Sequence, residues 1–279
     1  MSQLTPPQGS SQASNIKVSW DYTTHAQHYD KRADYSQEAI NNLVALTSCA
    51  PWRPVADIGA GTGKLTKELL QRGLTVKSVE PNEAMRSFGI KNTSAQSVSW
   101  SAGTGEATNL QTSSVYGAFF GSSFNVVDQK KALNEICRIL VPNGWFACMW
   151  NHRDLEDPIQ KSIEEIIQSN IVGYSYGLRR EDPTSVIESS NCFSDVKTID
   201  GRFYWEMTRD DIIVAWKSHA TLRRQTGSDS AFDKIIAEIN SYLSSLKEPI
   251  SVPYTTRIYY AQMIKEKSDL NAALYSMAD

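Results

Sequence analysis

Three alternate glycines follow a short apolar run near residue 55 and open a segment of helical pattern. The run reads Val-Ala-Asp-Ile over residues 55–58, so a buried strand would deliver Asp57 to a loop that contains Gly59, Gly61 and Gly63. Glycine tolerates positive φ and lets a ligand approach the backbone closely. A helix N-terminus offers unpaired N–H groups to a carboxylate or another electron-rich group. This order of residues predicts a cradle for a small molecule.

Two other glycine-rich loops bind nucleotides, and both differ from this one. A dinucleotide site has Gly-x-Gly-x-x-Gly, whereas the spacing here is Gly-x-Gly-x-Gly. A phosphate loop requires Ser or Thr directly after its Gly-Lys pair, and here Leu65 follows Lys64. Glu80 comes 21 positions after Gly59, at the end of the next expected strand, where a carboxylate can accept hydrogen bonds from both hydroxyls of a ribose. The pattern therefore indicates a ribose-bearing ligand without the spacing of a dinucleotide site.

The glycine loop, the acidic residue of the second strand and a following Pro-x-x-x-Met segment together resemble the class I S-adenosylmethionine-dependent methyltransferases. The resemblance implies S-adenosyl-L-methionine as the cofactor. It implies the following cofactor-binding residues: Asp57, Gly59, Ala60, Gly61, Gly63, Glu80, Pro81, Asn82 and Met85. We expect Asp57 to order the loop through hydrogen bonds to backbone N–H groups rather than to act as a base.

The resemblance extends from about Tyr22 to Asp154 and is closest to the small-molecule branch that includes trans-aconitate methyltransferase-like proteins. Residues 29–35 are similar to that branch's tyrosine-rich lead-in, with Ala33 in place of its proline. Residues 140–144 and 150–154 are similar to the family's segments before and after its fifth strand. The resemblance implies further cofactor contacts, with Tyr29 and Arg32 at the methionyl end, Thr104, Gly105 and Glu106 at the adenine, and Gly121 and Ser122 after strand four. Packing against the core remains an alternative for Tyr29.

The sequence departs from the family where a histidine commonly lies near the site of methyl transfer. It reads Phe124-Asn125-Val126, so no imidazole stands at that position and the catalytic residues are unknown. His152 and His219 are the remaining candidates for a base, because His152 follows the fifth expected strand and His219 lies in the expected lid. Both can also be ordinary surface or core histidines, and neither has a recognisable partner residue.

The elements that must position these residues alternate between strand and helix. Residues 55–58, 64–72 and 74–80 predict a strand, a helix and a second parallel strand, and the alternation continues to about residue 150. It predicts an α/β fold with a doubly wound, mostly parallel sheet, which is the Rossmann-like methyltransferase fold, and with a helical cap. We expect a disordered tail over 1–15 and a methyltransferase domain over 16–279. Within that domain we expect a cap segment over about 16–47 and a lid insertion over about 152–226.

Composition disfavours several classes of partner. The net charge of −3 and the scattered basic residues disfavour nucleic acid, and the chain of 279 residues has no apolar run long enough for a membrane span. The four cysteines lie far apart and form no Cys-x-x-Cys pair, so neither a metal site nor a disulfide framework is predicted. We expect a cytoplasmic protein whose partner is a small-molecule substrate; the sequence does not give the oligomeric state.

These observations predict methyl transfer from S-adenosyl-L-methionine to a small-molecule acceptor, which is a carboxylate, an amine or a hydroxyl. The reaction would be an in-line displacement in which the protein acts mainly by positioning. Two alternatives stay open. One is a nucleotide-dependent oxidoreductase, and the other is a non-catalytic S-adenosylmethionine-binding protein, which Asn125 makes conceivable. A protein or tRNA methyltransferase is disfavoured by the charge.

Overall fold

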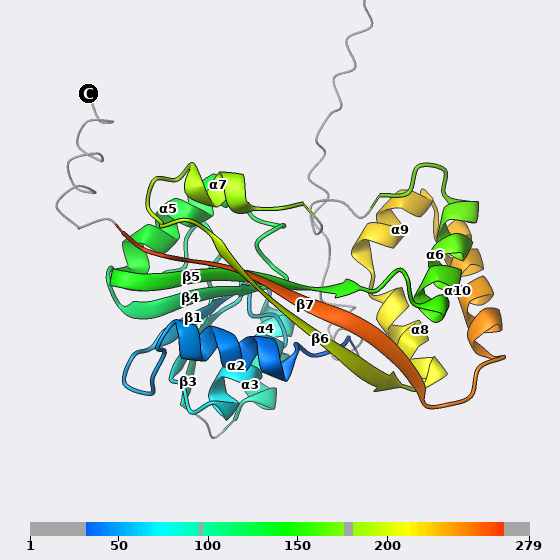
Figure 1. The fold of residues 1–279 in the computed structure, drawn as a ribbon, viewed down its shortest axis with the longest axis horizontal. Coiled ribbons are helices and arrows are strands. Elements are labelled where there is room, and N and C mark those ends of the chain that lie inside the picture. The colour runs from blue at the N-terminus through cyan, green and yellow to red at the C-terminus, as the bar shows by residue number, and fades with distance from the viewer. Residues whose placement is uncertain (1–31, 95–96, 176–180, 265–279) are drawn as a thin grey trace, which may run out of the picture.

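A seven-stranded sheet forms the centre of the molecule (Figure 1). The computed structural model describes residues 32–94, 97–175 and 181–264. The strands are β1 (Val55–Ile58), β2 (Val76–Val79), β3 (Val98–Ser101), β4 (Val115–Gly121), β5 (Leu140–Arg153), β6 (Lys197–Met207) and β7 (Ile250–Gln262). Their order is β3-β2-β1-β4-β5-β7-β6, and only β7 runs antiparallel to its neighbours. The predicted doubly wound, mostly parallel sheet is therefore confirmed.

Helices cover both faces of this sheet, as alternating strands and crossover helices require. The connections α3 (Lys64–Gln71), α4 (Glu83–Asn92) and α5 (Gln129–Ile139) join successive parallel strands. Apolar side chains of α3 and of α2 (Gln37–Leu46) form a core with one face, and those of α5 and α7 (Thr184–Glu188) form a core with the other. Because strand side chains alternate between faces, Val55 joins the first core and Ile58 the second.

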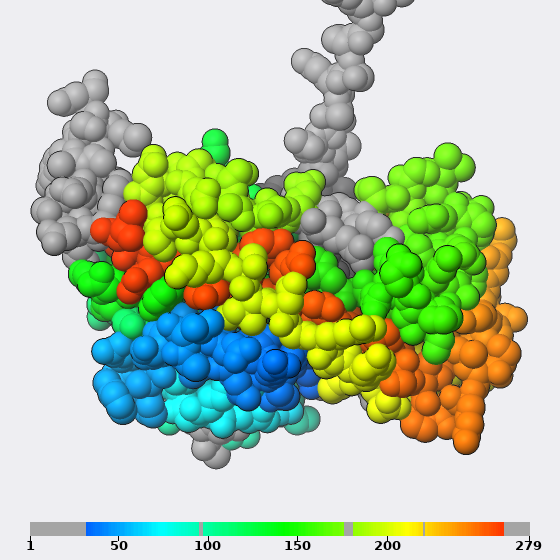
Figure 2. All heavy atoms as spheres, in the orientation of Figure 1, coloured from blue at the N-terminus to red at the C-terminus, as the bar shows by residue number. Residues whose placement is uncertain are grey.

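The remaining helices pack on one another at the far end of β5, β6 and β7. We call α6 (Pro158–Asn170), α8 (Arg209–Lys217), α9 (Ala220–Thr226) and α10 (Asp229–Leu243) the helical subdomain. A third apolar core, which includes Ile167, Phe232 and Ile239, holds these helices together and joins them to the β6 and β7 strands. Figures 1 and 2 show the subdomain as a lobe beside the sheet.

The extent of this subdomain differs from the expected lid over 152–226. β6 lies within that range but belongs to the sheet, where it pairs with β7. α10 lies beyond the range but packs against α6 and α8. The described part of the expected cap over 16–47 forms α2, whose residues Ile40 and Leu43 are fully buried against the sheet. The tail over 1–15 lies outside the described residues.

Gly201 of β6 allows α2 to lie close to the sheet. A Cβ atom at this position would approach the Cβ of Ala39 to 2.8 Å and would also meet Ser36, the N-cap residue of α2. Neither neighbour can rotate away, because both belong to the buried first turn of the helix. We expect Gly201→Ala to lower the free energy of unfolding by about 1–3 kcal/mol through overpacking. Urea denaturation measures this change, and an unaltered midpoint would contradict the proposed packing.

Candidate active site

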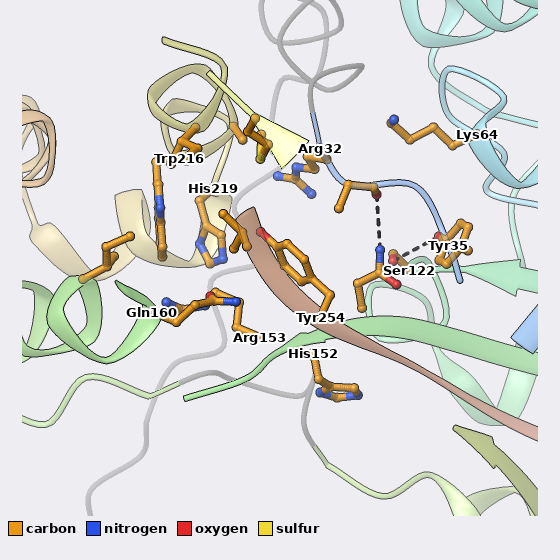
Figure 3. Close-up of a pocket in the computed structure, with 17 residues that line it drawn as sticks. Arg32, Tyr35, Lys64, Ser122, His152, Arg153, Gln160, Trp216, His219 and Tyr254 are labelled. Atoms are coloured by element: carbon orange, nitrogen blue, oxygen red, sulfur yellow. Dashed lines mark hydrogen bonds between the residues drawn. The ribbon is translucent and has the colours of Figure 1, made fainter. Parts of the chain in front are cut away.

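A pocket lies between the carboxyl edge of the sheet and the helical subdomain (Figure 3). This edge is where open α/β sheets bind their ligands. The sheet, α3 and the N-terminal segment contribute the residues Arg32, Ala33, Tyr35, Lys64, Ser122, Asn151, His152, Arg153, Val252 and Tyr254. The residues on the side of the helical subdomain are Gln160, Ile163, Met207, Ile212, Ala215, Trp216 and His219. The pocket thus brings the predicted residues Arg32, Ser122 and His219 to one place, and His152 lies at its border.

The glycine loop passes from β1 to α3 beside this pocket. Gly59 has a φ of +68°, and a Cβ atom there would lie 2.6 Å from the Cβ of Ser123, so the loops after β1 and β4 can approach only because this residue is glycine. The amides of Gly59 and Ala60 donate to the carbonyl oxygen of Val79, at 2.8 and 3.0 Å, and the amide of Gly63 donates to Ala60 at 2.9 Å. These amides are engaged within the protein, so the loop provides a close-fitting surface more than a row of free N–H donors.

Glu80 links the end of β2 to the glycine loop. Its Oε2 accepts a hydrogen bond from the amide of Gly61 at 2.9 Å, and its Oε1 accepts one from the amide of Asn82 at 2.8 Å. Burial raises the pKa of this carboxyl, and the two N–H bonds oppose the increase. A carboxylate has about four acceptor sites, so each oxygen keeps a lone pair for a ribose hydroxyl. The geometry therefore fits the expected adenosyl compound.

The residues after Glu80 build the start of α4 around the same loop. Asn82 is the N-cap of α4, and its side chain accepts a hydrogen bond from the amide of Met85 at 3.0 Å. The Met85 side chain is buried and lies where a Cβ of Gly61 would come within 3.3 Å of its methyl group. Pro81 is exposed. The glycine loop, Glu80 and the start of α4 thus contact one another.

Asp57 lies beneath the glycine loop and is fully buried. Its Oδ2 accepts a hydrogen bond from the Thr66 hydroxyl at 2.6 Å, and this hydroxyl also lies 2.8 Å from that of Ser78. Its Oδ1 has no hydrogen-bond partner among the described residues. Burial raises the pKa of Asp57 to about 7, although the bonds from Thr66 lower it. Asp57 therefore holds the start of α3 to β1 through the Thr66 hydroxyl, and the backbone N–H of Thr66 also lowers the pKa of this carboxyl.

The segment after β3 lies against the end of β2, because a Cβ atom on Gly103 would come within 2.8 Å of the Val79 side chain. Thr104 is exposed, and its hydroxyl accepts a hydrogen bond from the amide of Ala107 at 3.2 Å. Gly105 is buried against Val127 and Phe120. Glu106 accepts a hydrogen bond from the amide of Asp128 at 2.8 Å, which ties the segment to the start of α5. The expected adenine contacts are thus built as a tight turn at the edge of the sheet.

Ser122, after β4, lies where the cofactor residues meet the pocket. It has a φ of +59°, and its hydroxyl is 3.2 Å from that of Tyr35. A Cβ on Gly121 would come within 2.8 Å of the same tyrosine hydroxyl, so the absence of a side chain there admits Tyr35. Tyr29, which was expected at the methionyl end, lies outside the described residues.

Arg32 spans the pocket to the helical subdomain. Its Nε donates to the Ser218 hydroxyl at 3.0 Å, and its Nη2 donates to the Ser218 carbonyl oxygen. The amide of Leu222, which would bond this carbonyl in a continuous helix, donates instead to Nδ1 of His219 at 3.2 Å. This pair of contacts explains why α8 and α9 are separate helices.

His219 and Arg153 both lie close to the indole of Trp216. The imidazole centroid of His219 is 5.1 Å from that of Trp216, and the guanidinium carbon of Arg153 lies 4.7 Å from a Trp216 ring centroid. Nη2 of Arg153 also lies 2.7 Å from Oε2 of Glu164, and the two side chains form a largely buried ion pair. Burial raises the pKa of the nearby Tyr254 hydroxyl, and the charges of Arg153 and Arg32 oppose this. Tyr254 therefore presents a protonated hydroxyl.

His152 borders the pocket, but its imidazole points away from the other labelled side chains (Figure 3). Alternation along β5 explains this, because Asn151 and Arg153 face the pocket and the residue between them faces the opposite side. Asn125, which replaces the family histidine, accepts a hydrogen bond from the Trp150 indole at 2.8 Å. Its observed contact is therefore with β5, and it does not line the pocket.

The sequence analysis missed several residues that shape the pocket. Lys64 was considered only as part of a failed phosphate-loop motif, and Tyr254 was not singled out. Asn151 and Arg153 stood in the segment 150–154, which offered a signal. In the described part of the chain, no group of three or more His, Cys, Asp or Glu side chains could hold a metal ion. Within the same residues, no helix has both the length and the apolar character of a membrane span.

Comparisons with known proteins agree with this geometry. Residues 56–148 match the sequence family described as "Methyltransferase domain". An uncharacterized methyltransferase of Mycobacterium tuberculosis is 35% identical over 136 residues, which are 49% of this chain and 54% of that protein. The ubiquinone/menaquinone biosynthesis C-methyltransferase UbiE of Caulobacter vibrioides is 26% identical over 197 residues, or 63% of this chain and 77% of that protein.

A solved structure shows the same fold. It is phosphoethanolamine N-methyltransferase 2 of Haemonchus contortus in complex with phosphomonomethylethanolamine and S-adenosylhomocysteine, with a TM-score of 0.53 and 14% identity over 87% of this chain and 58% of that one. The chain spans about half the length of the first mycobacterial relatives that it matches. Residues 56–148 are therefore the part of this chain that is similar to a methyltransferase domain.

Proposed function

We propose that this protein transfers a methyl group from S-adenosyl-L-methionine to a small molecule held in the pocket. One observation carries the proposal. The pocket runs from Tyr35 and Ser122, beside the cofactor loops, to Trp216 and His219 of the helical subdomain. A single pocket thus joins the expected methionyl end to space for a second molecule. Pockets between a sheet edge and an added subdomain commonly hold small molecules.

The cofactor supplies a methyl group already activated on a sulfonium centre, so the chain's own residues mainly bind and orient. Glu80 would accept the ribose hydroxyls, and the turn at Thr104 would border the adenine. The glycine loop would give close contact to the sugar, since Gly59 and Gly61 present no side chains. Precise alignment of two bound reactants can lower a barrier by about 7–11 kcal/mol, which leaves little need for further catalysis.

The lining residues support an oxygen-rich acceptor with an apolar body. Ile163, Met207 and Trp216 provide an apolar wall, and Tyr254 and Gln160 provide polar groups. The described residues that line the pocket include no Asp or Glu, so a cationic amine would lack a carboxylate there. We therefore place a carboxylate or hydroxyl acceptor before an amine. The likeness to the trans-aconitate methyltransferase-like branch rests on the segments 29–35 and 150–154 and remains part of this proposal.

The hydrogen bond to His219 favours a tautomer that is unsuited to a general base. Its Nδ1 accepts the Leu222 N–H bond, so the proton of a neutral imidazole lies on Nε2. A general base typically contributes about 10²–10⁴-fold to a rate. Because His219 does not act as a general base, we expect His219→Asn to lower kcat by less than about 10-fold. Asparagine preserves a side-chain cap for α9. A loss of about 100-fold or more in His219→Asn, measured with the identified acceptor, would show that the imidazole takes part in catalysis.

The experiment that tests the function is a screen for methyl transfer. Full-length protein is incubated with metabolite extracts and S-adenosyl-L-methionine that carries an isotopic label on the methyl group. Mass spectrometry then identifies labelled products. We expect at least one labelled small molecule whose formation requires the protein and stops with excess S-adenosylhomocysteine. Cofactor binding with no labelled product from any extract would favour the non-catalytic binding protein instead.

A further inference from the structure

We propose that Lys64 is the counter-ion for the carboxylate of the cofactor's methionyl group, and that it exchanges its bond to Asp34 for that carboxylate when the cofactor binds. In the structure the Lys64 Nζ lies 2.6 Å from Oδ1 of Asp34. The inference rests on the proposed function, because it assigns one end of the same cofactor. It concerns a residue that the family resemblance did not include.

The topology places the methionyl end beside Lys64. Glu80 fixes the adenosyl end at the edge of β2, and the sheet order β2-β1-β4 carries the ligand across β1 toward Ser122. Lys64 is the first residue of α3, directly after the glycine loop of β1. Its side chain lines the pocket on the same side as Tyr35 and Ser122 (Figure 3). A carboxylate in this place also faces the N-terminus of an eight-residue helix, which favours negative charge.

The other two cationic side chains of the pocket wall are committed to the helical subdomain. Arg32 directs its Nε and Nη2 to Ser218, and Arg153 is bound to Glu164 within a largely buried pair. Lys64 differs because its partner is accessible: the side chain of Asp34 is 38% exposed, against 8% for Glu164. An exposed carboxylate returns to water at little cost, so its ion pair is the one that a ligand can replace.

The backbone around Asp34 can stay in place during this exchange. The side-chain amide of Asn151 donates to the carbonyl oxygens of Ala33 and Asp34, at 3.2 and 2.9 Å. The amide of Ser36 donates to the Thr256 hydroxyl at 2.8 Å, and that hydroxyl donates to Asn151 at 2.6 Å. The segment is thus fixed to β5 and β7 through its main chain, and only the Asp34 side chain has to rotate.

Two ligands separate the carboxylate contact from the rest of cofactor binding. S-adenosylhomocysteine carries the amino-acid group, and 5′-methylthioadenosine retains the adenosine and sulfur without it. We expect Lys64→Met to lower the affinity for S-adenosylhomocysteine by about 10-fold to 100-fold, because it removes one charge-assisted hydrogen bond. Calorimetry on the full chain measures this affinity. Affinity for 5′-methylthioadenosine should stay within about 2-fold. Lys67→Met removes the same charge from an exposed position of α3 and should change neither affinity.

Variants of Asp34 complete the test. Asp34→Asn should bind S-adenosylhomocysteine at least as tightly as the wild type, because it removes the competing carboxylate. The double variant Asp34→Asn with Lys64→Met should be as weak as Lys64→Met alone. The proposal is overturned if Lys64→Met binds S-adenosylhomocysteine with wild-type affinity, or if its affinity for both ligands falls by the same factor. It is also overturned if the double variant regains wild-type affinity for S-adenosylhomocysteine. A wild-type protein that binds neither ligand would instead refute the proposed function.

Discussion

We expect the replacement of Glu80 with alanine to lower the affinity for S-adenosylhomocysteine by about 100-fold or more, because two hydrogen bonds to a charged group are worth about 1.5–3 kcal/mol each. The variant lacks the acceptor that we propose for both ribose hydroxyls. It also loses the two bonds, to the amides of Gly61 and Asn82, that hold the glycine loop against the start of α4. Direct recognition and the shape of the loop therefore fail together. Calorimetric titration of the full chain measures the effect.

Glu83→Ala is the matched control for this variant. Glu83 lies three positions after Glu80, in the exposed first turn of α4. Its replacement by alanine removes the same charge and leaves the bonds to the glycine loop in place. Its affinity should equal that of the wild type. Thermal denaturation without ligand must show that both variants are folded. If folded Glu80→Ala bound S-adenosylhomocysteine as tightly as Glu83→Ala, the assignment of this carboxylate to the ribose would be wrong.

We expect the free energy of unfolding of the wild type to fall between about pH 4 and about pH 7, and we expect Asp57→Asn to remove most of this fall. The carboxyl has an ordinary pKa of 3.8 and a folded-state pKa of about 7, which burial causes. Within this window the folded protein holds a proton that the unfolded chain has released. Unfolding therefore becomes easier as the pH rises toward 7, and the stability present below the unfolded pKa is lost. The pKa difference corresponds to on the order of 4 kcal/mol.

Asparagine cannot ionise, and its side-chain oxygen can still accept the bond from Thr66. The variant should therefore show a flatter profile of unfolding free energy against pH. The comparison concerns the slope and not the absolute value, because the amide nitrogen would occupy the place of the Oδ1 atom that has no partner among the described residues. Urea denaturation at several pH values provides the profile. Parallel profiles for wild type and variant would show that Asp57 is ionised in the folded protein throughout.

The sequence predicted the parts of the fold that depend on local pattern. Strand, loop and helix over residues 55–80 follow from apolar periodicity and from glycine at the turn, and the structure has all three within a few residues of the expected limits. The position of β6 could not be derived in this way, because it depends on pairing with β7. The break between α8 and α9 depends on Arg32, which is 186 positions from Ser218. No local pattern records such a contact.

Local sequence motifs likewise predicted one part of the candidate site and not the other. The contacts expected for the adenosyl group lie in short motifs, so Glu80 and the glycine loop could be located without coordinates. The acceptor side is assembled from single residues of β5, α6, α8 and β7, of which Arg153 and Tyr254 lie 101 positions apart (254 − 153) and pair across two strands. Only the fold places them together. The assignment of Lys64 likewise needed the position of Asp34 in the folded chain.

A crystal structure of the full chain with S-adenosylhomocysteine tests the central claim most directly. The account predicts the ribose hydroxyls at the Glu80 carboxylate, the adenine beside the turn at Thr104, and the sulfur at the Ser122 end of the pocket, open toward Trp216. It would be contradicted if the ligand lay elsewhere on the molecule, or if its sulfur faced away from the cavity beneath the helical subdomain.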